Sequence, residues 1–285
     1  MNTTLINFLK TELKWNIINL SSIERIGGLS SENYKVSYNN NNYFIKICTH
    51  NYLHTDRKNE LTIINKAEAI NIAPHLYYFS NKTGNMVSRW ITGDMPSLTD
   101  FSSTKFLHNL SDSLKRFHSL ECEKSFNPFE HIRKRLTICQ KLNLPLPKSI
   151  DMLLKHLTNL EIRLNKNPLI GLCHNDLNAS NIILNNDNLY FVDYEYSSMG
   201  DIFFDLATIS WFFPEDSRKN LLKFYFGEFN DEHYEKLLDY LFIVKFYNAT
   251  WSLLKSHDST SNYNYLSGAQ MIFKELLNYK SIRNF

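Results

Sequence analysis

Residues 172–193 read LCHNDLNASNIILNNDNLYFVD. This order of residue types predicts a strand, a polar loop, a second strand, a turn and a third strand. The loop places His174, Asp176 and Asn181 between two apolar runs, although a simple connection needs only turn residues. The third strand ends on Asp193. We therefore expect the carboxylates of Asp176 and Asp193 and the amide oxygen of Asn181 to lie close together, as a site suited to Mg²⁺.

Two residues nearer the N-terminus extend this pattern. Lys46 lies within an apolar predicted strand, and Glu60 lies near the start of the next predicted helix. In kinases such a pair positions the nucleotide phosphates, a loop Asp accepts the proton of the substrate hydroxyl, and an Asn five residues later holds a metal ion. Asp176 and Asn181 have this separation. Each feature alone is common, but the four together in this order predict a kinase with a Lys46–Glu60 ion pair.

The remaining chain divides into two regions of different composition at residues 92–96, TGDMP. Before this break the pattern predicts a small sheet with helices, and after it helices dominate. The early elements are a helix over 5–13, a hairpin over 34–38 and 43–48, a helix over 56–70, and strands over 75–79 and 85–90. The later helices are predicted over 106–117, 152–164, 202–213, 221–245 and 270–280. We expect an α+β fold with two lobes, residues 1–91 and 92–285, and a hinge near residues 90–94.

Composition excludes several classes of protein. In 285 residues, 31 Lys and Arg stand against 29 Asp and Glu, so a net charge of +2 gives no signal for nucleic acid or an anionic membrane. The four cysteines are scattered without a C-x-x-C motif, which favours reduced thiols over disulfides or a zinc site. Residues 1–10 lack the apolar run of a signal peptide, and other apolar stretches are short or interrupted. We expect a cytoplasmic protein with neither a nucleic-acid partner nor integral membrane association, and the oligomeric state stays open.

Four short motifs carry a resemblance to a known family. HND at 174–176 with Asn181, DYEY at 193–196 and FDLA at 204–207 resemble the choline/ethanolamine kinase family, within the wider aminoglycoside-phosphotransferase-like kinase fold. WSLL at 251–254 is similar to the C-terminal tryptophan motif of that family. The resemblance covers most of the chain. It implies a protein-kinase-like fold, with a small N-terminal antiparallel sheet lobe, a larger and mainly helical C-terminal lobe, and ATP between them.

The resemblance also implies roles for individual residues. Asp176 would be the catalytic base, and Asn181 and Asp193 would hold Mg²⁺. Lys46 and Glu60 would form the clamp on the phosphates of ATP.

The expected nucleotide loop departs from the usual glycine pattern. Residues 27–33 read GGLSSEN rather than G-x-G-x-x-G. Ser30, Ser31 and nearby backbone N–H groups can still hold phosphate. We also expect Trp90 to take part in nucleotide binding.

For the acceptor, the resemblance makes choline the first substrate and ethanolamine the second. A quaternary ammonium prefers aromatic faces with a nearby carboxylate. The residues expected to bind it are Glu195, Tyr196, Trp211 and Trp251. The family often has a second tryptophan where this chain has Asn248, but losing one cation–π contact costs about tenfold in affinity and not the whole site.

Two alternatives remain open from the sequence. The acceptor can instead be thiamine, an aminoglycoside or a sugar on the same fold. The chain can also be a kinase-like nucleotide-binding module without catalysis, although the intact set of Lys46, Glu60, Asp176, Asn181 and Asp193 argues against a decayed site. Other residues have structural interpretations: Asp205 is expected to brace the catalytic loop or cap a helix, His118 to pack, and the basic run at 133–135 to form a solvated helix face.

Overall fold

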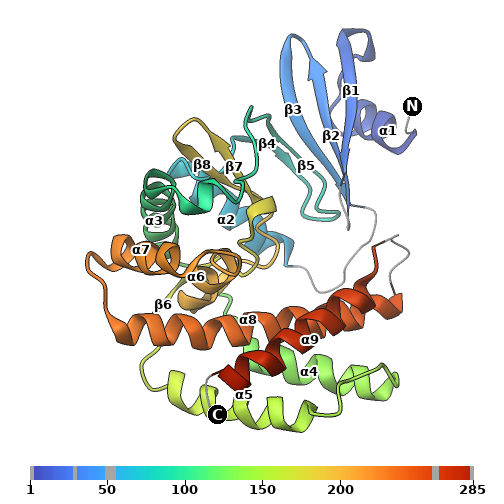
Figure 1. Cartoon of the computed structure of the whole chain (residues 1–285). Helices are drawn as coiled ribbons and strands as arrows, with labels where there is room; N and C mark the ends of the chain where they lie inside the picture. Colours follow the sequence, from blue (N-terminus) through green and yellow to red (C-terminus); the bar gives the residue numbers. More distant parts are fainter. Residues whose placement is uncertain (1–2, 28–30, 49–55, 259–262, 283–285) are drawn as a thin grey trace. The chain divides into compact units, whose positions relative to one another are not determined.

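The computed structural model describes residues 3–27, 31–48, 56–258 and 263–282 (Figure 1). The chain forms two compact units, and each is described by itself. Unit 1 comprises Met1–Met95 and Ser180–Tyr196, and unit 2 comprises Pro96–Ala179 and Ser197–Phe285. We expected lobes of 1–91 and 92–285. Unit 1 instead extends to Met95 and also includes Ser180–Tyr196.

Backbone pairing explains why that segment joins unit 1. Asp94 and Leu184 exchange two backbone hydrogen bonds, with N···O distances of 3.2 and 2.8 Å. The backbone N–H of Phe191 donates to the carbonyl of Ile72 at 2.8 Å. The segment is thus hydrogen-bonded at both ends to the chain before residue 96.

The sheet of unit 1 is antiparallel and has five strands in the order β1-β2-β3-β5-β4 (Figure 1). The strands are β1 Leu20–Gly27, β2 Ser31–Tyr38, β3 Asn41–Cys48, β4 Leu76–Phe79 and β5 Met86–Arg89. Strands β2 to β5 confirm the predicted ranges to within a few residues. Strand β1 was not predicted, because its sequence LSSIERIG is largely polar and most of its side chains are exposed.

Two helices accompany this sheet and confirm the predicted ranges. Helix α1, Thr3–Thr11, buries Leu5, Phe8 and Leu9 in a core shared with sheet residues. Helix α2, Arg57–Ala69, begins after Asp56, whose side chain accepts a hydrogen bond from the N–H of Asn59 at 3.0 Å. This is a normal N-cap, and it fixes the start of the helix that carries Glu60.

Residues 180–196 contain a second, smaller sheet. Strands β7, Ile182–Asn185, and β8, Asn188–Phe191, pair with Ile182 opposite Phe191. Asn181 directly precedes β7 and Asp193 follows β8, so they lie at the same end of this hairpin. The last strand ends two residues before Asp193, which adopts a positive φ of 68°.

Unit 2 is mainly helical, as predicted (Figure 1). Its helices are α3 Thr104–His118, α4 Pro128–Lys141, α5 Ile150–Leu164, α6 Phe203–Ile209, α7 Glu215–Phe226, α8 Asp231–Asp258 and α9 Tyr265–Ile282. A short antiparallel pair joins β6, Ile170–Cys173, to β9, Ser198–Asp201. Helix α8 packs against α4, α6 and α9, and its central residues Phe242, Ile243, Val244 and Phe246 are fully buried.

The helical predictions need correction at three places. The helix expected over 202–213 is shorter, because α6 ends at Ile209. The single helix expected over 221–245 is two helices, because α7 ends at Phe226, before Gly227 with its left-handed φ of 90°, and α8 begins at Asp231. Helix α4 was not assigned a range; it begins at Pro128, and the Asn127 side chain accepts from the N–H groups of Phe129 and Glu130. Over the described parts of the chain, no helix is long and apolar enough to cross a membrane.

Candidate active site

An ion pair between a buried lysine and a partly exposed aspartate lies at the centre of the candidate site in unit 1. The Nζ atom of Lys46, on β3, lies 2.7 Å from Oδ1 of Asp193. Only 5% of Lys46 is exposed. Burial by itself would lower the pKa of Lys46, but the carboxylates of Asp193, Glu195 and Glu60 raise it above its usual value. The ammonium is therefore a fixed positive charge among carboxylates.

The expected partner of Lys46 was Glu60, and this detail is corrected. Glu60 instead forms an ion pair with Arg57, one turn earlier on α2, with Nη1 and Oε2 2.7 Å apart. Arg57 lies three residues before Glu60, a spacing that brings the two side chains together on a helix. Glu60 remains close enough to raise the pKa of Lys46, and its own pKa is raised by burial.

Arg57 was not predicted from the sequence as a site residue. Its guanidinium is buried, and its Nη1 atom also lies 3.9 Å from Oε2 of Glu195. It packs against Gly84, where a Cβ atom would lie 2.4 Å from Cζ of Arg57. The available signal was the i, i+3 Arg–Glu spacing, but such pairs are common on exposed helix surfaces. We call Lys46, Arg57, Glu60, Asp193 and Glu195 the charged cluster.

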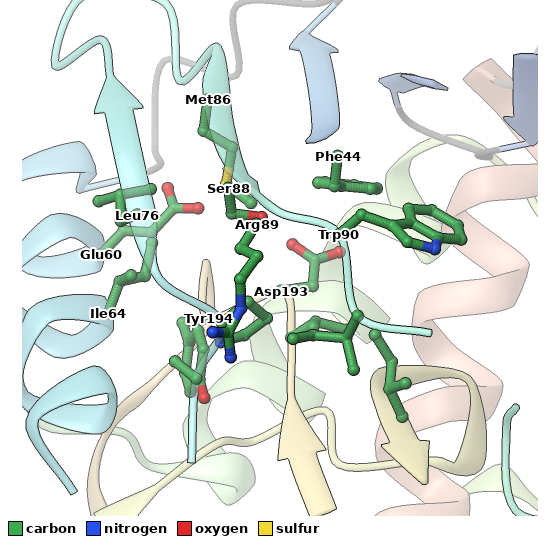
Figure 2. A pocket seen from close by; sticks show the side chains of 15 residues that line it. Phe44, Glu60, Ile64, Leu76, Met86, Ser88, Arg89, Trp90, Asp193 and Tyr194 are labelled. Atoms are coloured by element: carbon green, nitrogen blue, oxygen red, sulfur yellow. The ribbon is translucent and has the colours of Figure 1, made fainter. Parts of the chain in front are cut away.

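A pocket adjoins the charged cluster within unit 1 (Figure 2). Glu60 and Asp193 supply carboxylates to its lining. Most of the lining is apolar and includes Phe44, Ile64, Leu76, Met86, Trp90 and Val192. Such a cavity suits a flat apolar group that is joined to charged groups.

The other residues expected to bind nucleotide have different positions. Trp90 lines the pocket, and the ammonium of Lys35 lies 4.9 Å from the centre of its ring. Ser31 begins β2 and is buried, with its hydroxyl donating to Oδ1 of Asn33 at 3.1 Å. Ser30 lies outside the described residues.

The backbone places the two expected metal ligands, Asn181 and Asp193, at one end of the β7–β8 hairpin. The backbone N–H of Val192 donates to the carbonyl of Asn181 at 3.0 Å, which ties the residue before Asp193 to Asn181. An amide oxygen and a carboxylate are the donor types that hard divalent cations take. The donors therefore fit Mg²⁺ chemically.

Glu195 belongs to the charged cluster, and Tyr196 lies next to it in the chain. The side chain of Glu195 is 11% exposed. Burial and the charge of Asp193 raise the pKa of Glu195, while Lys46 and Arg57 oppose that rise. Tyr196 is 42% exposed. Tyr194 is buried, its hydroxyl donates to the carbonyl of Phe191 at 3.0 Å, and it also lines the pocket.

In unit 2, a single buried carboxylate holds the loop that contains Asp176. Asp205, on α6, accepts hydrogen bonds from the backbone N–H groups of His174 at 2.6 Å and Asn175 at 2.8 Å. Asn175 has a left-handed φ of 64°, and its side-chain amide donates to Oγ of Ser198 at 2.9 Å. The prediction that Asp205 braces this loop is confirmed.

Asp176 follows this braced backbone directly. It is half-buried, and its Oδ1 atom accepts a hydrogen bond from the side chain of Asn178 at 3.2 Å. The next residue, Leu177, is fully buried. The backbone on both sides of Asp176 is therefore fixed while its carboxylate keeps some exposure.

The two candidate tryptophans of unit 2 have separate surroundings. Trp211 stacks on Phe212, and the ammonium of Lys245 lies 5.3 Å from its ring centre. Trp251, on α8, contacts Tyr265 edge to face at 5.7 Å. Both tryptophans are half-buried, so each keeps part of its surface accessible.

The basic run at 133–135 does not form a uniformly solvated surface. Arg133 pairs with Glu161, and Lys134 pairs with Glu130 on the same helix. Arg135 instead stacks on Tyr247, with Cζ 4.0 Å from the ring centre. The expectation of a solvated face is thus wrong for Arg135.

Comparison with known proteins now decides the family. A model of the choline/ethanolamine kinase family matches residues 23–225. The chain belongs to this family. A protein named Protein LicA homolog from Metamycoplasma hominis is 30% identical over 217 residues, which make up 74% of this chain and 79% of that protein.

Solved structures agree with the membership. A choline/ethanolamine kinase family protein from Mesorhizobium loti has a TM-score of 0.85 at 19% identity, covering 97% of this chain and 93% of that one. The choline kinase LicA from Streptococcus pneumoniae has a TM-score of 0.80 at 22% identity, covering 97% and 99%. At these identities the likeness shows the fold, and the predicted protein-kinase-like α+β fold is confirmed.

As a member of the choline/ethanolamine kinase family, the chain is an ATP-dependent phosphotransferase with an alcohol group as acceptor. The family resemblance inferred from the short motifs is confirmed. Of the residues that the resemblance singles out, four lie in the charged cluster of unit 1, and Asp176 lies on the braced loop of unit 2. The roles of the individual residues remain predictions.

Proposed function

We propose that this kinase transfers the γ-phosphate of ATP to the hydroxyl of choline, with ethanolamine as its second substrate. The observation that carries the proposal is the ion pair between the buried Lys46 and the partly exposed Asp193, beside an apolar pocket in unit 1. A nucleotide combines a flat apolar base with a chain of negative charges, and this pocket and cation match those two parts.

For the nucleotide, we assign Lys46 to the phosphates and Trp90 to the wall of the base pocket. Glu60 acts indirectly, because its carboxylate is held by Arg57 and adds to the negative field around Lys46. Ser30 and Ser31 are proposed to approach the phosphates through hydroxyl and backbone N–H groups. Lys46 stays protonated throughout, since the neighbouring carboxylates raise its pKa.

We assign Mg²⁺ to Asn181 and Asp193. The support is the donor chemistry of these two residues and their position at one end of the β7–β8 hairpin. When bound, Mg²⁺ supplies positive charge that offsets the negative charge of the phosphate groups. Lys46 would add a second positive charge in the same unit.

Asp176 is the proposed catalytic base. It accepts the proton of the acceptor hydroxyl while the oxygen forms a bond to the γ-phosphorus, and the bond from that phosphorus to the bridging oxygen of ADP breaks. Asp205 acts through the backbone, because its two hydrogen bonds fix the residues just before Asp176.

For the acceptor, we propose that Trp211 and Trp251 offer aromatic faces to the ammonium group. The choice of Glu195 and Tyr196 as further substrate contacts rests on the family motif. Choline is favoured over ethanolamine because a quaternary ammonium gains from aromatic faces, whereas a primary ammonium also needs hydrogen-bond acceptors. Thiamine, an aminoglycoside or a sugar remain acceptors to be tested.

We also propose that the enzyme acts in the cytoplasm on small molecules alone. All four cysteines are free, which suits a reducing compartment. Arg133 and Lys134 are paired with carboxylates on helices α4 and α5, and this does not favour a nucleic-acid partner.

A substrate panel tests this proposal. Purified protein with ATP and Mg²⁺ is given choline, ethanolamine, thiamine, an aminoglycoside and a sugar, and release of ADP is followed in each case. We expect the highest kcat/KM with choline and the second highest with ethanolamine. Turnover of another acceptor but neither amino alcohol would contradict the substrate, and turnover without Mg²⁺ or a replacement divalent cation would contradict the metal site.

A further inference from the structure

A continuous chain of side-chain hydrogen bonds lies behind the loop of unit 2. Nδ1 of His118, the last residue of α3, lies 2.8 Å from the hydroxyl of Tyr225 on α7. Nε2 of His118 lies 3.3 Å from Oδ2 of Asp205. Oδ2 also accepts from the N–H of His174, and Oδ1 accepts from the N–H of Asn175.

One assignment of protons satisfies every link. Burial raises the pKa of Tyr225 well above its usual value, so its hydroxyl is protonated and can donate. If Tyr225 donates to Nδ1, then the ring proton of His118 lies on Nε2 and is donated to Asp205. The tyrosine thus selects the tautomer that contacts the carboxylate. The prediction that His118 merely packs is incomplete.

The orientation of the Asp205 carboxylate matters for both backbone N–H groups that it binds. Asp205 is fully buried, and only 3% of the His118 side chain is exposed. If the carboxylate rotated, the hydrogen bonds from the N–H groups of His174 and Asn175 would be broken, which is costly at a buried site. The hydrogen bond from His118 opposes that rotation, and Tyr225 fixes the plane of the imidazole.

The same atoms do not make a convincing metal site. His118, Cys173 and Asp205 each place one potential ligand atom within 4.8 Å of the other two. However, burial raises the pKa of the Cys173 thiol well above its usual value, and a thiol is a poor metal ligand unless deprotonated. Both oxygens of Asp205 already accept backbone hydrogen bonds. The arrangement is better explained as support for the loop.

We propose that His118 and Tyr225 are positioning residues for phosphoryl transfer: through Asp205, they hold the backbone that places Asp176. This inference rests on the proposed role of Asp176 as the base. Neither residue contacts the reacting atoms in this scheme. Their loss should therefore lower kcat and leave KM for both substrates nearly unchanged, because a misplaced base affects the chemical step more than binding.

Two substitutions at one position separate positioning from simple packing. In His118→Gln, the terminal amide nitrogen takes the place of Nε2 and can still donate to Asp205. In His118→Asn, the shorter amide lies near the place of Nδ1, so it can bond Tyr225 but does not reach Asp205. We expect kcat to fall about 30-fold in His118→Asn and no more than about fivefold in His118→Gln.

Tyr225→Phe removes the hydrogen bond between Tyr225 and His118, at the far end of the chain of contacts. Tyr240→Phe is a matched control. Tyr240 is also buried and bonds a carboxylate, Asp201, but it lies outside the chain of contacts to Asp205. We expect kcat to fall about threefold to tenfold in Tyr225→Phe and to stay unchanged in Tyr240→Phe, even where both variants melt at lower temperature.

Amide hydrogen exchange at His174 and Asn175 gives a readout that needs no substrate. We expect faster exchange at both amides in His118→Asn and wild-type exchange in His118→Gln and Tyr240→Phe. Equal kcat in the two His118 variants, or unchanged exchange in His118→Asn, would overturn the inference. If the wild-type protein turns over neither amino alcohol, the proposed function fails, and the exchange measurement still decides whether His118 holds the loop.

Discussion

The two units hold their candidate functional residues in different ways. In unit 1, side chains of opposite charge bind one another, as in the Lys46–Asp193 pair and the Arg57–Glu60 pair. In unit 2, the carboxylate of Asp205 binds backbone N–H groups, with His118 in contact behind it. The first arrangement can exchange partners when a charged ligand arrives, because each ion pair has alternatives nearby. The second is less adaptable, because breaking hydrogen bonds to buried backbone N–H groups is costly.

This contrast indicates which functional residues can rearrange when a ligand binds and which are held rigidly. A nucleotide with its metal ion brings several charges, so the residues that meet it benefit from being able to rearrange. A catalytic base has to be placed within a fraction of an ångström, so its backbone benefits from rigidity. Substitutions in unit 1 should therefore mainly change nucleotide affinity, whereas substitutions around the loop of unit 2 should mainly change kcat.

Replacing Asp176 should have the largest effect. Asp176→Ala removes the proposed base and is expected to lower kcat about 10³-fold or more, while ATP binding measured by calorimetry stays near that of the wild type. Asp216→Ala, at an exposed position at the start of α7, is the control and should keep full activity. Retention of kcat in Asp176→Ala would remove this residue from the mechanism.

Lys46→Met tests whether a substitution in unit 1 mainly changes nucleotide affinity. It keeps much of the side-chain volume but removes the charge, so we expect kcat/KM for ATP to fall about 100-fold, with ATP binding visibly weakened. Lys58→Met, on the exposed surface of α2, controls for the general loss of a lysine. If only kcat fell and ATP bound normally, the division of roles between the units would be wrong.

Trp251→Leu tests the acceptor side of unit 2. We expect KM for choline to rise about tenfold, because one cation–π contact is lost, with KM for ATP unchanged. Trp251→Phe keeps an aromatic face and should recover most of the affinity. An equal rise in KM for both amino alcohols and for ATP would indicate a general packing defect instead.

Gly84→Ala should have the smallest effect and is the sharpest test of the charged cluster. The added methyl group would collide with the guanidinium of Arg57 and move it away from Glu60 and Glu195. We expect KM for ATP to rise about threefold. Gly227→Ala is a matched control, since it has a similar positive φ of 90° but open space around the new Cβ. Kinetic parameters should change only in the first variant, although both should lose some stability from backbone strain, about 1 kcal/mol each.

Sequence reasoning succeeded where the signal was local. The five-residue separation of Asp176 and Asn181 identified the loop, and a lysine inside an apolar strand identified Lys46. Helix ends with strong caps, such as the start of α2 at Asp56, were also placed closely. In each case the physical cause lies within a few residues of the feature.

Sequence reasoning failed where two interacting residues are distant in the sequence and meet only in the folded chain. Lys46 and Asp193 are 147 residues apart, and no spacing rule could choose Asp193 over Glu60 as the closer partner. Tyr225 carries no motif, and its role depends on helix α7 packing against α3. Strand β1 was missed because its pairing with β2, and not its own apolar content, makes it a strand.

The assignment of Ser180–Tyr196 to unit 1 has a consequence for synthesis on the ribosome. The unit begins at the N-terminus, yet the partner of Lys46 is made about 100 residues after Met95. At a typical translation speed, the sheet of unit 1 leaves the ribosome roughly 5–20 s before Asp193. During that interval Lys46 has no partner from residues 180–196, and burying its ammonium would be costly. The nascent unit should therefore stay open around β3 until the β7–β8 hairpin arrives and completes it.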